Sequence, residues 1–384
     1  MPNGKWSDDT FLDALRRQGD PPADETVARL IADGGTQAVG PIFRMLQAND
    51  TPLPANAPNP LKDFMESSAG LPPDIDRTRL PRGSEVFLRH AMPSVVVLLA
   101  SSLPRGYAAP CLSEILSISR DLQRHPFDRL MGVVQLLINI SDADAFQPDG
   151  RAIVTAQKLR LLHAGIRSIT LKYRPHYQEK FGVPVNHEDM LATIMGFSYL
   201  LIDGLRRLDL ELQDAEAEDL YYAWRLFALL MGIHPDGRPH DDSFVPATLA
   251  EAAEFYASYV RRNNTMPDRN GYGVLLAQDN LKMMEGLLPQ PLRRLGLSYA
   301  PRICMTELMT PAELARVGLT PFPGHKLLKA LLTGIFWLTT RKHELFAARL
   351  ARLLLQGMVD VDRSGQVEFS IPFTRLDARG SAFE

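Results

Sequence analysis

Cysteine, long apolar runs and an excess of charge of one sign are all scarce in this sequence of 384 residues. The two cysteines, Cys111 and Cys304, are far apart and form neither a disulfide framework nor a zinc motif. The longest apolar stretches, near 95–100 and 331–338, are much shorter than a bilayer span. The formal net charge is −3, and no basic run indicates a nucleic-acid-binding surface. These features favour a globular protein with no membrane span and no nucleic-acid partner.

Short catalytic and metal-binding motifs are missing as well. The chain has no Glu-x-x-His pair for a di-iron site, no Gly-x-Ser-x-Gly elbow, and no phosphate-binding or dinucleotide-binding loop. His187-Glu188 and His343-Glu344 lack the second histidine that a zinc peptidase places four residues after the first. The spacing gives no support to an iron site of two histidines and one carboxylate. The absence of these motifs favours, by elimination, a chemistry that a bound cofactor carries out.

The two ends of the sequence bear on location and on fold. Residues 1–9 lack the charged-then-apolar profile of a secretion signal, so we expect a cytoplasmic protein. Residues 360–365 copy the first half of a calcium loop, but Ile371 occupies the position of the bidentate glutamate. The strand-like runs on either side predict a small C-terminal hairpin instead of a calcium site.

Helical periodicity dominates from Gly83 onward, and segments rich in β-branched residues are few. The pattern therefore predicts an all-α protein with one large helical domain. Residues 1–82 form N-terminal helices and a Pro-rich wrapping segment, residues 83–356 the helical domain, and residues 357–384 the hairpin and tail. The predicted helices span 9–18, 25–46, 61–67, 84–101, 109–122, 126–140, 152–173, 187–203, 213–231, 246–261, 274–285, 311–316 and 323–356.

An octet in the middle of the chain, Arg-Leu-Leu-His-Ala-Gly-Ile-Arg at 160–167, carries the most information. The helix predicted around it is apolar on nearly every side, which is typical of a buried helix. Positions i, i+3 and i+7 share one face, so Arg160, His163 and Arg167 form a cationic row inside the protein. Two buried guanidinium groups are costly unless anionic partners meet them.

Two interpretations of this row are open. His163 could ligate a haem iron, with Arg160 and Arg167 meeting the haem propionates or acidic side chains. Alternatively, His163 is a hydrogen-bonded core residue, and the arginines pair with aspartate or glutamate from neighbouring helices. Periodicity alone does not decide between them. No Cys-x-x-Cys-His sequence is present, so any haem would be held noncovalently.

The octet resembles the Arg-x-x-His-Ala-x-x-Arg signature of the rubber oxygenase family, which includes latex clearing proteins and oxygenases of the mycophenolic acid pathway. Further blocks resemble sequences of that family in the same order, at 80–87, 102–108, 182–193, 204–206 and 222–225. Together they cover roughly residues 70–235. The resemblance implies a globin-like core with additional helices around it, and a noncovalent haem b whose axial ligand is His163.

The same resemblance implies an activity. Members of this family add O2 to a carbon–carbon double bond of an apolar substrate and cleave it, so the resemblance implies an oxygenase acting on an apolar or polyprenyl-like molecule. A different oxidation of a small metabolite, a haem sensor without turnover, and a helical scaffold without cofactor are the alternatives.

Three positions depart from the pattern of the rubber-cleaving members, and two of them belong to the distal side of the haem. The rubber-cleaving members have an Arg-x-x-Lys-Thr segment, and the matching stretch here keeps Arg129 but has Gly132 and Val133 in place of the lysine and threonine. A second histidine that follows the octet in those members is Ser168 here. We therefore expect no protein ligand at the sixth iron position, and rubber cleavage does not follow from the resemblance.

Three further side chains are candidates for catalytic roles by this resemblance. Arg129 would donate a hydrogen bond to bound dioxygen. Glu114 matches a distal acid that can act as a base, or it pairs with an arginine. Thr193 matches the family block and faces the site, or it bonds back to its own helix.

Overall fold

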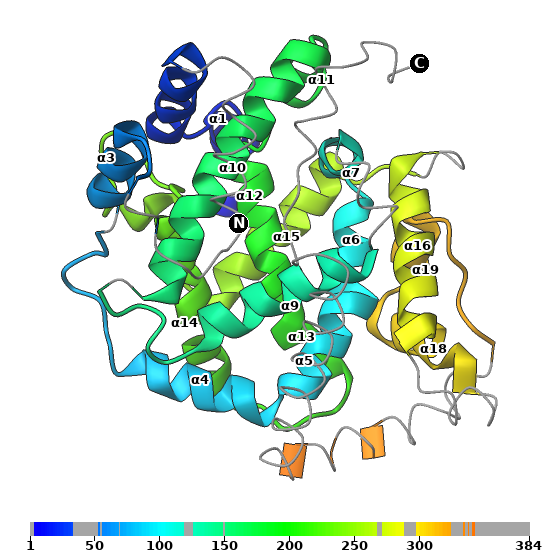
Figure 1. Cartoon of the computed structure of the whole chain (residues 1–384). Helices are drawn as coiled ribbons and strands as arrows, with labels where there is room; N and C mark the ends of the chain where they lie inside the picture. Colours follow the sequence, from blue (N-terminus) through cyan, green and yellow to red (C-terminus); the bar gives the residue numbers. More distant parts are fainter. Residues whose placement is uncertain are drawn as a thin grey trace.

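Helices account for every regular element in the described part of the computed structural model (Figure 1). The structure describes residues 4–33, 56–68, 70–118, 126–148, 150–266, 271–287 and 297–323, and the isolated residues 53, 333, 334, 337, 340 and 341. In α9 the side chains before Gly132 are not described. The predicted C-terminal hairpin and most of the predicted helix 323–356 lie outside these residues. Within them, the all-α prediction is confirmed.

The elements before the centre of the chain are short. They are η1 (Lys5–Ser7), α1 (Asp9–Arg16), a helix at 21–33, α3 (Asn59–Ser67), α4 (Arg79–Arg89), α5 (Ala91–Val97), the π-helical turn η2 (Leu98–Ser102), α6 (Leu103–Tyr107) and α7 (Pro110–Ile118).

The longer helices follow. They are α9 (Pro126–Ser141), α10 (Arg151–Tyr173), α11 (Tyr177–Phe181), α12 (His187–Phe197), α13 (Tyr199–Arg207), α14 (Asp214–Leu230), η3 (Asp242–Phe244), α15 (Leu249–Asn263), α16 (Tyr272–Leu287), η4 (Leu297–Tyr299), α18 (Ala300–Leu308) and α19 (Pro311–Arg316).

Two predicted helices are broken in the structure. The segment 84–101 was expected to be continuous, but α4 ends at Arg89, and the following helix leaves at 79°. The ring nitrogens of His90 lie 2.9 Å from the carbonyl oxygen of Val86 and 3.2 Å from that of Glu211, which fixes the bend. The predicted helix 187–203 is interrupted at Ser198, whose φ of −119° and ψ of −84° are not helical.

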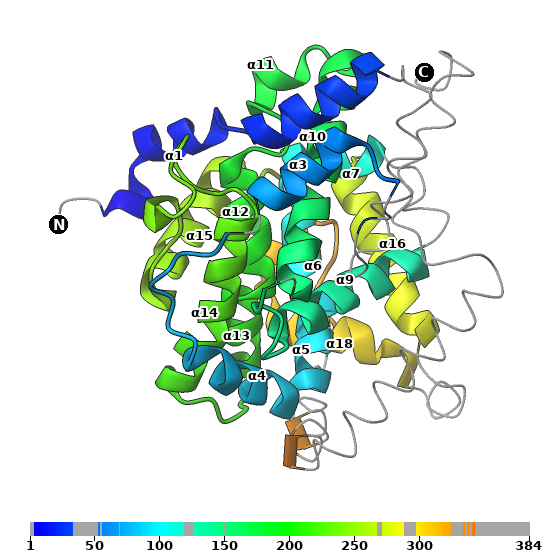
Figure 2. The ribbon, with the colours of Figure 1, turned by 60° about the vertical axis from the view of Figure 1, so that its left-hand side comes forward.

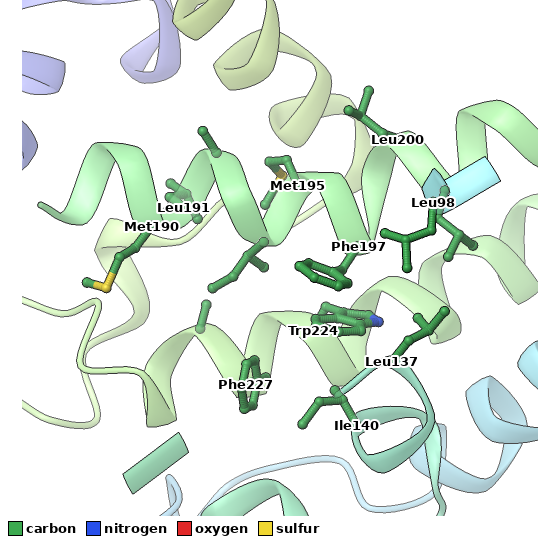
Figure 3. Close-up of a cluster of buried hydrophobic side chains, with 14 of the residues drawn as sticks. Leu98, Leu137, Ile140, Met190, Leu191, Met195, Phe197, Leu200, Trp224 and Phe227 are labelled. Carbon is green, nitrogen blue, oxygen red and sulfur yellow. The ribbon is translucent and has the colours of Figure 1, made fainter. Parts of the chain in front are cut away.

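The core lies between the central helices and is built from large apolar side chains. Figure 3 shows Phe197 of α12 lying over Trp224 of α14, with ring centroids 5.1 Å apart and planes inclined by 16°. Leu137 and Ile140 of α9 pack on the same cluster, and neither has any exposed surface. An offset aromatic pair of this kind stabilises a core beyond the area that it buries.

The N-terminal helices close one end of this core. Figure 2 shows α1 and the helix 21–33, in dark blue, lying across the end of the molecule that α10 and α11 occupy. Backbone hydrogen bonds from Val183 to Arg16 and from His187 to Gln18 join the N-terminal loop to the start of α12. The N-terminal segment is therefore part of the packed body.

No described helix is by itself long and apolar enough to cross a membrane. The bent pair Arg79–Arg89 and Ala91–Tyr107 passes that test of length and composition only when its two parts are taken together.

Close contact between α4 and α14 depends on a glycine. A Cβ atom on Gly83 would lie 2.6 Å from the backbone oxygen of Asp219. We expect Gly83→Ala to destabilise the fold, because overpacking costs about 1–3 kcal/mol whereas alanine gains only about 1 kcal/mol in helix propensity. Urea unfolding measures the change. Gly286→Ala is the control, since a Cβ there meets nothing within 4 Å; equal effects in the two variants would contradict the assignment.

Candidate functional site

His163 lies in the middle of α10, a helix of 23 residues that is buried on almost every side. Its imidazole is enclosed by protein and yet keeps part of its surface accessible, while Nδ1 is buried and has no hydrogen-bond partner among the described residues. Desolvation, followed by the charge of Arg167, lowers the pKa of His163 to about 4. The ring is therefore neutral at pH 7, which is the form that binds a metal ion.

The two arginines of the octet both bind carboxylates from the N-terminal segment. Arg160 donates from Nε and Nη2 to the two oxygens of Asp20, at 2.6 and 2.9 Å. One helical turn after Asp20, Asp24 accepts from Nε of Arg167 at 2.7 Å. Both arginines therefore have acidic side chains as partners, as one of the two interpretations of the sequence requires.

Arg167 keeps an unused donor. Its Nη1 donates to the carbonyl oxygen of Val185 at 3.3 Å, whereas its buried Nη2 has no partner among the described residues. A buried donor without an acceptor is costly. This guanidinium could therefore accommodate one more anionic or carbonyl oxygen, and a role for the arginines in holding a cofactor remains a prediction.

Thr193 is exposed although its helix, α12, lies inside the molecule and packs against α1, α6, α13, α14 and α15. Its neighbours on the helix, Ala192 and Ile194, are buried. Gly196 shares the face of Thr193, and a Cβ there would meet only Ser102, at 3.8 Å. This face of α12 therefore borders space that the side chains of the described residues do not fill. The Thr193 hydroxyl donates to the carbonyl oxygen of Asp189 at 2.9 Å, which is the backbone bond named as its alternative.

The remaining sequence candidates come from α7 and α9. Glu114 of α7 accepts from Nη1 of Arg174 at 2.9 Å, at the end of α10 that lies about 16 Å of helix rise beyond His163. Arg129 belongs to α9, and its side chain is not among those described. Gly132 and Val133 are buried in the same helix. The catalytic roles of Glu114 and Arg129 stay predictions.

A buried ionic network at the start of α12 was not anticipated from the sequence. Glu188 and Asp189, which are 0% and 2% exposed, both accept from Arg16 of α1, at 2.6 and 3.2 Å. Arg262 of α15 also donates to Glu188, at 3.1 Å, and Tyr259 donates to Asp189 at 3.0 Å. The two acidic residues therefore fasten α1 and α15 to α12.

Only part of this network could be predicted from the sequence. Asparagine is a typical residue at the start of a helix, and the side chain of Asn186 accepts from the backbone N–H of Asp189. Acidic residues in a first turn are favoured by the helix dipole, so Glu188 and Asp189 carry no signal of their buried partners. Asp20 could have been found from Asp20-Pro21, since an aspartate followed by proline is a typical helix start. The backbone N–H of Ala23 indeed donates to the Asp20 carboxylate at 3.3 Å.

A second buried histidine makes stability depend on pH. Desolvation lowers the pKa of His187 from 6.5 to about 4. Because the unfolded state binds this proton at higher pH than the folded state, stability is full above pH 6.5 and is lost as the pH falls towards 4. We expect His187 to contribute a loss of about 3 kcal/mol over that range.

Unfolding of wild type and His187→Gln by urea at several pH values measures this contribution. The variant should show a flatter decline between pH 6.5 and 4, and His176→Gln, at an exposed position, should behave as wild type. An equally steep decline in His187→Gln would contradict the assignment.

The sequence matches a family model and a curated protein. A family model described as "ER-bound oxygenase mpaB/B'/Rubber oxygenase, catalytic domain" matches residues 89–354. The "Rubber oxygenase" of Streptomyces sp. (strain K30) is 26% identical over 238 residues, which are 60% of this chain and 55% of that protein. The chain thus spans about half the length of this curated relative.

A solved structure shows that the fold is shared as well. "Structure of Latex Clearing Protein LCP in the closed state" superposes with a TM-score of 0.67 at 21% sequence identity. The match covers 85% of this chain and 84% of that chain, so it includes nearly all of the helical body.

Proposed function

Because the chain belongs to the family of ER-bound and rubber oxygenases, we propose that it is a haem-dependent oxygenase of an unsaturated apolar substrate. One observation carries the haem assignment. By the resemblance of its octet, His163 takes the position of the family's histidine. It lies in a helix that is buried on almost every side, as a neutral imidazole with accessible surface and a ring nitrogen that has no partner among the described residues. His90, by contrast, has partners for both of its ring nitrogens. The ring nitrogens of His187 also have no partner among the described residues, but that residue is only 1% exposed, so His163 alone of these three combines an unpaired nitrogen with accessible surface.

The residues around His163 fit a haem. Its neutral ring offers a lone pair at Nε2, and Nδ1 then carries the proton. Nη2 of Arg167 is buried and has no acceptor among the described residues, so it could donate to a propionate oxygen. Asp20 binds the Nε and Nη2 edge of the Arg160 guanidinium with both of its oxygens, so we propose that Arg160 orients α10 rather than contacting the cofactor.

Bound haem would supply the iron centre that activates dioxygen. The chain's own contribution is to shape the surrounding space. Thr193 and Gly196 leave room on one face of α12, and the hydroxyl of Thr193 remains accessible there. Gly132 and Val133 have no ligating side chains, so neither residue would bind the iron of a bound haem. We propose that O2 adds across a carbon–carbon double bond and yields two carbonyl groups, with Arg129 as hydrogen-bond donor and Glu114 as base.

Oxygen uptake by the haem-loaded protein tests this function. We expect O2 consumption that depends on an unsaturated apolar substrate, such as a polyprenyl oligomer, together with carbonyl products from the cleaved double bond. The saturated analogue is the control. Uptake with oxidised products but no chain cleavage would indicate a different oxidation, and haem binding without any uptake would indicate a sensor; either outcome overturns the proposal of cleavage.

Space beside Gly196 is expected to receive substrate. Gly196→Leu would fill the open face of α12 next to Thr193, so we expect kcat/KM for O2 uptake to fall about tenfold or more while haem retention stays the same. Gly286→Leu, on the exposed surface of α16, is the matched control and should leave uptake unaltered. Unchanged uptake in Gly196→Leu would show that this face is not used.

A further inference from the structure

Polar groups from four separate segments gather around the octet. Arg160 and Arg167 come from α10, Asp20 from the loop before helix 21–33, His187 from the start of α12 and His234 from the loop after α14. Asp20 is 3% exposed, and both of its oxygens are used, by Arg160 and by the backbone of Ala23. A single buried carboxylate therefore lies at the centre of this cluster.

The charge of Asp20 also acts on two other imidazoles of this cluster. Burial is the main cause that lowers the pKa values of His187 and His234, and in both cases the negative charge of Asp20 opposes that shift. Although burial raises it, the pKa of Asp20 itself is lowered by the hydrogen bonds and charge of Arg160, so this carboxyl stays ionised at neutral pH.

Asp20 also fixes geometry. Its two oxygens hold Nε and Nη2 of Arg160 in a bidentate pair, the most directional contact between these groups. Arg160 precedes His163 by three residues, so this pair restrains the rotation of α10 at the turn that presents the imidazole. Gly232, with φ of +82°, packs on the other side of the same guanidinium, where a Cβ would lie 3.2 Å from Nε.

We propose that Asp20 is a positioning residue of the haem site, which fixes the orientation of the His163 helix and sets the charge around the axial imidazole. The residue lies outside the region 89–354 that matches the family's catalytic domain. The N-terminal segment thus contributes to the site, although the family motif does not include it. The inference rests on the proposed haem binding.

Asp24 is a natural control for Asp20. It lies in the helix that begins directly after Asp20, pairs with the other arginine of the octet at a similar distance, and carries the same charge. Its side chain is 40% exposed, however, so water and salt screen its interaction with Arg167. Replacing each carboxylate in turn by a neutral side chain therefore compares the effect of a buried charge on haem binding with that of an exposed charge.

The test compares Asp20→Asn and Asp24→Asn in the full-length chain. We expect the haem dissociation constant of Asp20→Asn to rise about 10–100-fold, as is common when an outer partner of a metal ligand is lost. For Asp24→Asn we expect a change of less than about fivefold. Transfer of haem to an excess of apomyoglobin measures both.

A second measurement separates positioning from mere stability. At saturating haem, Asp20→Asn should shift the iron midpoint potential to a more positive value and alter the iron–histidine stretching frequency, because a negative charge near the ligand is lost. Asp20→Glu should restore part of both values, and it serves as the test variant if Asp20→Asn does not fold.

Three outcomes overturn the inference. Unchanged potential and stretching frequency in Asp20→Asn, with wild-type haem affinity, would remove Asp20 from the site. Equal effects in Asp20→Asn and Asp24→Asn would reduce both to general charge effects. A wild-type chain that takes up no haem would overturn the proposed function as well, which distinguishes the two failures.

Discussion

Replacing His163 by glycine is expected to abolish haem retention, with a loss of affinity of at least about 100-fold, because even outer partners of a metal ligand contribute 10–100-fold. The imidazole is the side chain of the octet that offers a neutral lone pair, since desolvation and the charge of Arg167 hold its pKa at about 4. The variant also leaves a cavity of the size of imidazole. The measurement is the Soret absorbance that remains after gel filtration of the reconstituted protein.

Added imidazole makes this experiment sharper. It should enter the cavity of His163→Gly and restore part of the haem spectrum, which a general folding defect would not allow. His90→Gly removes another buried imidazole, one whose ring nitrogens are already within hydrogen-bond distance of backbone carbonyls, and it should lose stability but keep haem. An unaltered Soret band in His163→Gly would contradict the ligand assignment.

Replacing Arg16 by methionine is expected to destabilise the fold by about 3–5 kcal/mol. The substitution keeps an unbranched apolar stem and removes the cation that lies 2.6 Å from Glu188 and 3.2 Å from Asp189. Both carboxylates are buried, and loss of their partner leaves negative charge in a medium of low dielectric constant. Since domains are commonly stable by only about 5–15 kcal/mol, a large fraction of the stability would be lost.

Urea unfolding at pH 7 measures this loss. Arg29→Met is the matched control, because Arg29 pairs with Glu25 on the surface, where both side chains are at least 60% exposed. Such a pair contributes no more than about 1 kcal/mol. If Arg16→Met cost no more than Arg29→Met, then Arg262 and Asn263 would be sufficient partners for Glu188, and Arg16 would not fasten α1 to α12.

Local sequence patterns were sufficient for the long helices but not for their ends or partners. The prediction of 152–173 agrees closely with α10, because this stretch contains no proline and its apolar residues continue on every side. The break at Ser198 carries no such signal, since serine is tolerated within helices. The helix 300–308 was missed because Pro301 resembles a loop residue, although proline is favoured in a first helical turn.

The candidate site, too, was predictable only in part. Arg160, His163 and Arg167 share one helix, so their spacing alone placed them on one face. Their partners Asp20 and Asp24 lie about 140 residues earlier in the chain, and no local pattern pairs residues at that separation. For Thr193 the sequence left two interpretations open. The hydroxyl bonds to its own helix and the side chain is exposed, whereas its place at the site stays a prediction.

The absorption spectrum of the purified full-length chain, with a pyridine haemochrome assay, tests the central claim most directly. We expect a Soret band and a haemochrome spectrum of haem b, either as isolated or after reconstitution, and we expect both to be lost in His163→Gly. A wild-type protein that stays colourless after reconstitution would contradict haem binding, and the space beside α12 would then need another explanation.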